Sequence, residues 1–250
     1  MEITAKELRQ MASTVDDMHR DAMQTFREET ADAHLDASRS SRRGMLKTAG
    51  IAGIGGIALA AAPTMLPISS LLSAASAQGL TDVDIAVFAE SVELAAVAIY
   101  SDPDIGKLVT PDVAQVAQLF ASHHSDHAGA FAALAGAKAT GTANKSIVDL
   151  YTSTLKPKVM NQADALGLAQ VVENQAAATY AFALTALQSA DAAAGTATIL
   201  PIEAMHAVVL GMALGQSPAD QFPNGAFEAA TVGAIGDPKV GIDPAKYPVA

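Results

Sequence analysis

Two stretches of this chain, residues 82–101 and 161–189, carry the same pattern of a glutamate and a tyrosine separated by six residues. The pattern consists of Glu93 and Tyr100 in the first stretch and of Glu173 and Tyr180 in the second. Both stretches are rich in alanine and lack the alternating β-branched residues of a strand, so both predict helices. Because seven residues span about two helical turns, the glutamate and the tyrosine share one face of each helix.

A second helical stretch follows each of these, at about residues 110–136 and 197–214. Each carries a polar residue three positions before a histidine, which gives His124 with His127 and Glu203 with His206. From the glutamate to this final histidine the interval is 34 residues in the first pair of stretches and 33 in the second. The repetition indicates an internal duplication of a helix pair, in which each pair offers half of a metal site.

The glutamates that open the pattern and the histidines that close it have apolar neighbours at helical spacing, so they should face a core. Burying a carboxylate or an imidazole is costly unless the group is paired or bound to metal. Any one of these residues alone is more often a solvated glutamate or a hydrogen-bonded histidine. Their repeated spacing favours metal binding instead.

The chain contains no cysteine, which excludes disulfides, zinc fingers, iron–sulfur clusters and thiol nucleophiles. Any metal must therefore be held by Glu, Asp and His. These ligands suit iron, manganese or zinc, and we expect iron as the cofactor, although affinity alone does not choose among the three. The formal net charge of −11, with no arginine after Arg43, argues against a nucleic-acid partner.

Residues 41–77 have the ordered parts of an export signal. The sequence Ser-Arg-Arg-Gly-Met-Leu-Lys at 41–47 matches the twin-arginine pattern, an uncharged stretch follows at 48–81, and an Ala-Ser-Ala cleavage site ends at residue 77. We therefore predict that the twin-arginine machinery exports the protein across the cytoplasmic membrane, to the periplasm, the cell envelope or the medium. A cleaved signal would contact the membrane only transiently, whereas an uncleaved one is long enough to span the bilayer and tether the protein.

The resulting domains are an N-terminal extension at 1–40, the signal segment at 41–77, a four-helix bundle at 78–215 and a C-terminal tail at 216–250. Residues 5–29 fit an amphipathic helix, with disorder, a proofreading or chaperone contact, and a wrongly assigned start codon as alternatives for the first 40 residues. We expect the turn before the fourth helix at 191–196, with Pro201 either starting or kinking that helix. The tail should lie extended over the bundle, anchored by Phe222 and Phe227.

Four segments resemble exported bacterial proteins with a ferritin-like domain. They are Ser91–Ala96, Phe120–His127, Val172–Glu173 and Ile202–His206. The resemblance covers about residues 81–215. It implies an all-α fold, a four-helix bundle around a central site for one or two metal ions.

Carried over by position, the resemblance makes Glu93 and Glu173 terminal carboxylates, His127 and His206 terminal imidazoles, and Glu203 a bridging ligand. This chain departs from the family pattern at His124, where a second bridging glutamate is usual. Four carboxylates balance two divalent cations, whereas three carboxylates and a neutral histidine leave excess positive charge. The departure favours a single metal, or an asymmetric pair.

Several neighbouring residues have two interpretations. Glu90, one turn before Glu93, could replace the missing carboxylate, be solvated, or line the entry route. His123 lies about 100° from the ligand face, so it should either contact a ligand from outside or lie on the surface, and Asp126 is likewise off the ligand face. Tyr100 and Tyr180 either hydrogen-bond to the ligands or simply pack; we favour the hydrogen bonds.

The sequence therefore predicts an exported metal-binding bundle, and a redox-active centre that reacts with oxygen or peroxide is a further hypothesis. One alternative is a non-catalytic structural or stress-protective bundle without metal. Another is a helical module that binds a partner through the tail or residues 1–40. The sequence leaves open whether the protein is an enzyme.

Overall fold

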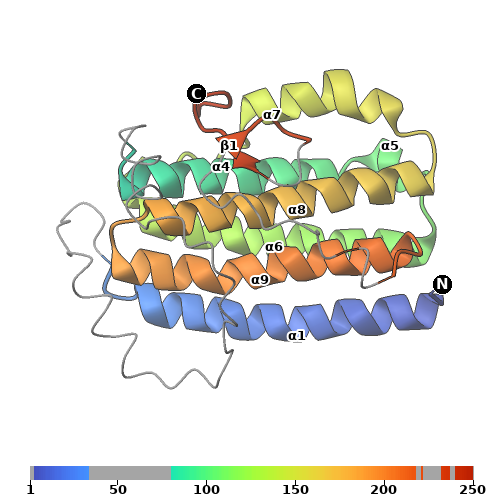
Figure 1. The fold of residues 1–250 in the computed structure, drawn as a ribbon, viewed down its shortest axis with the longest axis horizontal. Helices are drawn as coiled ribbons and strands as arrows, with labels where there is room; N and C mark the ends of the chain where they lie inside the picture. Colours follow the sequence, from blue (N-terminus) through green and yellow to red (C-terminus); the bar gives the residue numbers. More distant parts are fainter. Residues whose placement is uncertain (1–2, 34–79, 218–220, 222–231, 237–239, 250) are drawn as a thin grey trace, which may run out of the picture.

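The computed structural model describes residues 3–33, 80–217, 221, 232–236 and 240–249. Four long helices in this part of the chain form the bundle (Figure 1). They are α4 (Asp82–Tyr100), α6 (Pro111–Ala135), α8 (Gln162–Ala186) and α9 (Ala190–Ala213). α4 packs mainly against α6, and α8 packs mainly against α9. Each helix pair that the repeat predicted is thus a packed pair, and the all-α architecture is confirmed.

Signals at the helix ends explain these bounds. Thr81 starts α4 with a capping box, in which its hydroxyl accepts from the backbone N–H of Asp84 at 3.2 Å. Thr110 precedes Pro111, the first residue of α6. Proline is tolerated there because a backbone N–H in the first turn has no hydrogen-bond partner within the helix. Gly136 follows α6 with φ of 56°, which glycine adopts without strain. The first three predicted helices match α4, α6 and α8 to within three residues.

The fourth helix begins earlier than predicted. Residues 191–196, expected as a turn, form the first turns of α9. The chain reverses just before them, and the hydroxyl of Ser189 caps α9 by accepting from the N–H of Ala192 at 3.2 Å. The correction follows from local capping, because Ser189 supplies the helix start that the small residues after it obscured.

Two residues that usually interrupt helices lie inside α9. Gly195 sits where another helix passes so closely that an added Cβ would lie 2.6 Å from Cγ2 of Thr30. Pro201 also lies within α9, where it removes one backbone hydrogen bond without ending the helix. Tertiary packing therefore outweighs local propensity along this helix.

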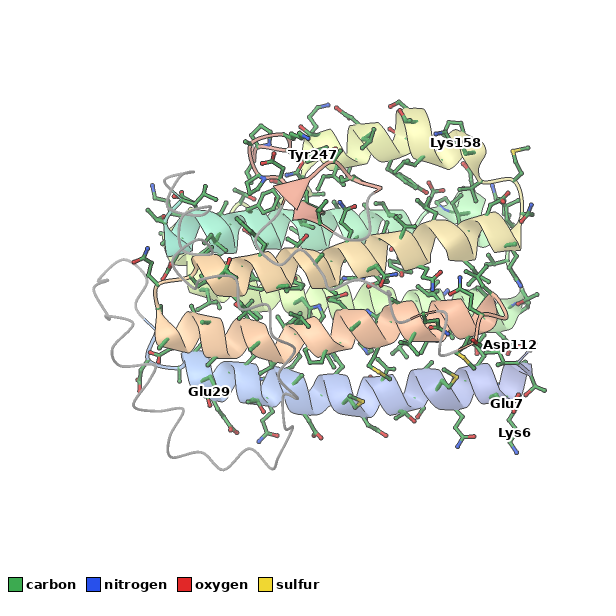
Figure 2. The ribbon with its side chains drawn as sticks, viewed as in Figure 1. Lys6, Glu7, Glu29, Asp112, Lys158 and Tyr247 are labelled. Carbon is green, nitrogen blue, oxygen red and sulfur yellow. The ribbon has the colours of Figure 1, made fainter. Side chains whose placement is uncertain are left out.

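A fifth long helix, α1 (Ala5–Thr30), lies along α9 and also contacts α6 (Figure 1). It is the amphipathic helix expected over residues 5–29. Its buried face consists of Leu8, Ala12, Val15, His19, Met23 and Phe26. Lys6, by contrast, points away from the bundle (Figure 2). α1 therefore belongs to the folded body and extends it beyond the four helices of the repeat.

Shorter elements cover the other side of the bundle, next to α4 and α8 (Figure 1). The helical ones are α5 (Pro103–Gly106), η2 (Gly136–Lys138), α7 (Lys145–Leu150), the π-turn η3 (Tyr151–Leu155) and η4 (Lys156–Lys158). Two short strands, β1 (Val232–Gly233) and β2 (Gly241–Ile242), pair in parallel with Val232 opposite Gly241. The described part of the tail thus contains a small strand pair lying over the bundle.

Hydrogen bonds fasten the described part of the tail to the helices. The N–H of Ile242 donates to Oγ1 of Thr179 on α8 at 2.9 Å. The side-chain amide of Asn144 donates to the carbonyl of Tyr247 at 2.9 Å, and Figure 2 marks Tyr247 beside the strand pair. The predicted anchors Phe222 and Phe227 lie outside the described residues.

The predicted export signal at 41–77 also lies outside the described residues. Within them, α9 is long and apolar enough to cross a membrane by composition alone, yet half of its most apolar window is buried inside the bundle. Its packing against α8 and α1 is what a core helix requires.

Candidate metal centre

Six polar side chains meet inside the bundle, and they are the six that the repeat identified. They are Glu93 of α4, His124 and His127 of α6, Glu173 of α8, and Glu203 and His206 of α9. None of them exposes more than 2% of its surface. All four helices of the bundle therefore contribute to one buried polar cluster, which we call the central cluster.

Helical geometry explains how the sequence builds this cluster. On α6 and on α9, two polar groups three residues apart project from the same face, one above the other. On α4, the buried alanines Ala89 and Ala96 flank Glu93 at helical spacing, and on α8 the buried Ala176 and Ala177 lie one turn after Glu173. Such small neighbours leave space between the helices for the longer polar side chains.

His124 connects the two halves of the central cluster. Its Nδ1 lies 2.7 Å from Oε2 of Glu93, and its Nε2 lies 3.1 Å from Oε1 of Glu173. One imidazole therefore contacts a carboxylate of each helix pair. In the metal-free state, a doubly protonated His124 can donate to both carboxylates at once.

Glu203 lies between the other two histidines. Its Oε1 is 2.8 Å from Nδ1 of His127, and its Oε2 is 3.3 Å from Nδ1 of His206. The same nitrogen of His206 lies 3.2 Å from Oε2 of Glu173. Glu203 thus faces both terminal imidazoles, as a bridging ligand must.

The six residues form two overlapping groups, each with ligand atoms within 4.8 Å of one another. The first consists of Glu93, His124, His127 and Glu203, and the second of His124, Glu173, Glu203 and His206. His124 and Glu203 belong to both groups. The arrangement therefore offers two adjacent candidate metal positions, with His124 and Glu203 within reach of both.

The unpartnered atoms of the central cluster test whether a metal ion fits. Within the described residues, neither oxygen of Glu203 and neither ring nitrogen of His127 has a hydrogen-bond partner. The 2.8 Å approach between them lacks hydrogen-bond alignment. Each buried polar group left without a partner costs roughly 1–3 kcal/mol. A cation ligated by this carboxylate and this imidazole would satisfy them, so the donor set fits a metal ion.

His124 limits how two ions could share the central cluster. A carboxylate can hold two metal ions about 3.5–4 Å apart with its two oxygens. The nitrogen lone pairs of an imidazole diverge, so His124 cannot bridge two ions at that separation. The geometry therefore favours one ion, or an asymmetric pair with Glu203 as the shared carboxylate.

Charge coupling within the metal-free cluster is strong. Burial alone would raise the pKa of Glu173, but the neighbouring His124 and His206 hold it well below its usual value. Burial alone would lower the pKa of His127, but Glu203 and Glu93 raise it to about 9. A metal ion must therefore displace protons from these histidines, which makes binding pH-dependent.

The two repeated tyrosines are cross-paired with the two repeated glutamates. Tyr100 of α4 donates to Oε1 of Glu173 on α8, and Tyr180 of α8 donates to Oε1 of Glu93 on α4. The hydrogen bonds to ligand carboxylates that the sequence favoured are present. Each tyrosine orients the carboxylate of the opposite repeat, which fixes the remaining oxygen toward the cluster.

Glu90 does not belong to the central cluster. It is buried, and its carboxylate accepts from the backbone N–H groups of Thr140 and Gly141 at 2.9 and 2.8 Å. It therefore fastens the loop after α6 and is neither the replacement ligand nor the solvated residue considered above. Although Glu90 lies one turn from Glu93 on the same helix, its side chain points to the loop and not to the central cluster.

His123 is buried beside the cluster rather than on the surface. Its Nδ1 lies 3.0 Å from Nε2 of His206, and its Nε2 lies 3.2 Å from Oδ1 of Asp16 on α1. His19 of α1 stacks on it, with ring centroids 3.9 Å apart. Sequence reasoning missed Asp16 and His19, although His19 falls in phase with Val15 on the apolar face of the predicted helix.

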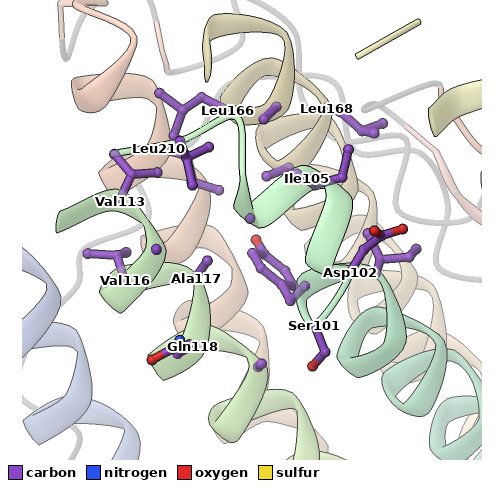
Figure 3. A pocket seen from close by; sticks show the side chains of 18 of the residues that line it. Ser101, Asp102, Ile105, Val113, Val116, Ala117, Gln118, Leu166, Leu168 and Leu210 are labelled. Atoms are coloured by element: carbon purple, nitrogen blue, oxygen red, sulfur yellow. The ribbon is translucent and has the colours of Figure 1, made fainter. Parts of the chain in front are cut away.

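An apolar cavity of about 440 Å³ lies at one end of the bundle, between α4, α6 and α8. Figure 3 shows Val113, Ile105, Leu166 and Leu210 around it. Tyr100, which donates to Glu173, also lines it. The cavity therefore reaches the hydrogen-bonding partner of a candidate ligand.

Comparison with known families agrees with this geometry. The model of a family described as ferritin-like domain matches residues 77–216, which is more than half of the chain and includes all six central residues. No curated protein and no solved structure gives a significant match. The matched segment contains α4 to α9 and leaves α1 outside. On the strength of this match, the chain belongs to the ferritin-like domain family.

Proposed function

We propose that this protein is an exported ferritin-like protein that binds one or two metal ions in the central cluster, with iron as the resident metal. The observation that carries the proposal is that buried atoms of Glu203 and His127 form ion pairs but no aligned hydrogen bond, beside four further ligand groups. A bundle that used these residues only for its own hydrogen bonds would leave those atoms at a cost. A cation removes that cost.

The chain's residues have distinct roles in this proposal. Glu203 is the shared carboxylate, and His127 and His206 are the terminal imidazoles on either side of it. Glu93 and Glu173 close the two positions, each oriented by a tyrosine of the opposite helix pair. Imidazole and carboxylate ligands suit iron, manganese and zinc alike, so metal analysis must identify the ion.

Redox chemistry is a second element of the proposal. Bound iron would supply one-electron chemistry toward oxygen or peroxide. The apolar cavity beside Tyr100 supports this, because it offers small apolar molecules a route toward the cluster. Filling it with Ala117→Phe should slow the reaction of the iron-loaded protein with oxygen while metal content stays unchanged. An unchanged oxidation rate would remove the cavity from the pathway.

Export by the twin-arginine machinery is also proposed, and it is supported by the sequence at 41–77. Cleavage after residue 77 would separate α1 from the bundle, although α1 packs on α6 and α9. Cell fractionation with a mass measurement of the exported chain tests this, with Arg42→Lys/Arg43→Lys as the export-deficient control. Equal distribution of both proteins between fractions would contradict the proposal.

Elemental analysis of the full chain is the test of metal binding. The wild type should contain about one or two iron, manganese or zinc ions per chain, as bundles with this ligand set do. His127→Ala/His206→Ala should lose them while circular dichroism retains the helical signal. Equal trace metal in both proteins, with no change in melting temperature on chelation, would instead support the metal-free structural bundle.

A further inference from the structure

α1 brings a second group of ligand atoms to the bundle, outside the central cluster. Asp16 and His19 on α1 lie against His123 on α6, and one ligand atom from each falls within 4.8 Å of the other two. His19 and His123 are buried, whereas the side chain of Asp16 is 22% exposed. We call these three residues the outer cluster.

His19 has a free ligand atom in this cluster. Within the described residues, its buried Nε2 has no hydrogen-bond partner. The nearest carboxylate oxygen described for it is Oδ2 of Asp126, at 4.0 Å, on a side chain that is 64% exposed. A buried imidazole nitrogen without a partner is costly on its own, and a ligand that contacts it would offset that cost.

We propose that Asp16, His19 and His123 form a second divalent-cation site between α1 and α6, for ions such as Zn²⁺ or Fe²⁺ that accept imidazole nitrogen. Two imidazoles and one carboxylate are a common donor set for these ions, with open positions left for water. Ligands around a tetrahedral zinc ion lie about 3.4 Å apart, given bonds of about 2.1 Å. Side-chain adjustments of about 1 Å would bring the three atoms together.

The two carboxylate oxygens of Asp16 face different partners. Asp16 Oδ2 pairs with Arg20, while its Oδ1 faces His123. One carboxylate oxygen therefore remains on the cluster side for a cation.

The outer and central sites are linked through His123 and His206. When His206 holds a central ion through Nδ1, its Nε2 carries the proton and Nδ1 of His123 must accept. His123 then carries its own proton on Nε2, which faces Asp16 and cannot ligate. A cation on Nε2 of His123 requires the opposite tautomers. The two sites should therefore fill alternately, with the outer site loading first because Asp16 reaches solvent.

The direct test is zinc binding by the full chain carrying His127→Ala/His206→Ala, which removes the central site. The variant should be isolated without bound metal, and we expect it to bind about one zinc ion when zinc is added in solution. Adding Asp16→Asn or His19→Gln should weaken this binding about tenfold or more. Asp17→Asn is the matched control, because Asp17 also pairs with Arg20 but is 71% exposed on the outer side of α1. Equal zinc affinity in all three variants, or no zinc in the parent, would overturn the proposal.

A second measurement uses chains with an intact central cluster, in case the double variant does not fold. Stopped-flow uptake of Fe²⁺ should be about tenfold slower in Asp16→Asn and His19→Gln than in Asp17→Asn, while final metal content stays equal. Equal uptake rates would contradict a loading role for the outer cluster. Metal binding in the central cluster is tested separately, because it is decided by the metal content of the wild type at equilibrium.

Discussion

The two helix pairs of the bundle carry the same residue pattern, but they differ at two positions in or beside the candidate metal site. Both supply a glutamate, a terminal histidine and a tyrosine that bonds across to the other pair. The α8–α9 pair adds Glu203, flanked by the apolar Ile202, whereas the α4–α6 pair has His124 and His123 at the matching positions. The six central residues are arranged symmetrically, but both changes are on α6, where His124 lies in the central cluster and His123 contacts α1. An unequal central site and an outer site arise from the same two substitutions.

The shared carboxylate should matter most in this comparison. Glu203 belongs to both ligand groups, so Glu203→Gln removes a charged ligand from each position at once. We expect bound metal to fall to trace levels, a loss of more than about a hundredfold in affinity. Glu90→Gln is the control, because that buried carboxylate holds a loop outside the central cluster. Metal content reduced equally by both changes would mean that general destabilisation, not ligand loss, is being measured.

The raised pKa of His127, the terminal histidine of the α4–α6 pair, also predicts how the stability of the metal-free protein depends on pH. The pKa of His127 is raised to about 9 in the folded state, against about 6.5 when unfolded. Its protonation therefore stabilises the fold fully below pH 6.5, and that contribution is lost as the pH rises to about 9. The raised pKa values of His124 and His206 act in the same direction.

We expect the chelated protein to lose about 3 kcal/mol of unfolding free energy between pH 6.5 and 9 from His127 alone. Urea unfolding at several pH values measures this loss, and His127→Gln should make it smaller while leaving the part due to His124 and His206. The pKa values of His19 and His123 are lowered to about 3, so these two residues change the unfolding free energy only below pH 6.5. Stability that rises with pH across the interval would contradict the charge coupling of the central cluster.

Restoring the symmetry of the two pairs should have a smaller effect of the opposite sign. His124→Glu supplies a fourth carboxylate and a second group that can hold two ions at short separation. The substitution should tighten the weaker metal position by about ten- to a hundredfold, and it should raise the metal content toward two ions per chain. Metal titration with elemental analysis tests this. Weaker binding at both positions would show that the site binds metal better with His124 than with the bridging glutamate of the family pattern.

Much of this arrangement follows from local sequence, because the six central residues share helix faces at repeated intervals. The capping residues Thr81 and Asn161 likewise place the starts of α4 and α8. What sequence could not provide depends on contacts between distant segments. Gly195 is inside a helix because α1 passes beside it, and Glu90 turns away because the loop at 140–141 offers two backbone N–H groups. Helical periodicity assigns a face to each residue, but it does not identify the partner on that face.

The smallest expected difference between the two helix pairs concerns their tyrosines. A tyrosine two turns along its own helix is about 10 Å from its own glutamate, so only the cross-paired contacts are within reach. Tyr180 is 3% exposed, and Tyr180→Phe would leave Oε1 of Glu93 without its donor in a dry site. Tyr100 borders the cavity, where water can replace its hydroxyl in Tyr100→Phe. We expect the first change to weaken metal binding by about tenfold and the second by less. Equal losses would show that the cavity gives water no access to Glu173.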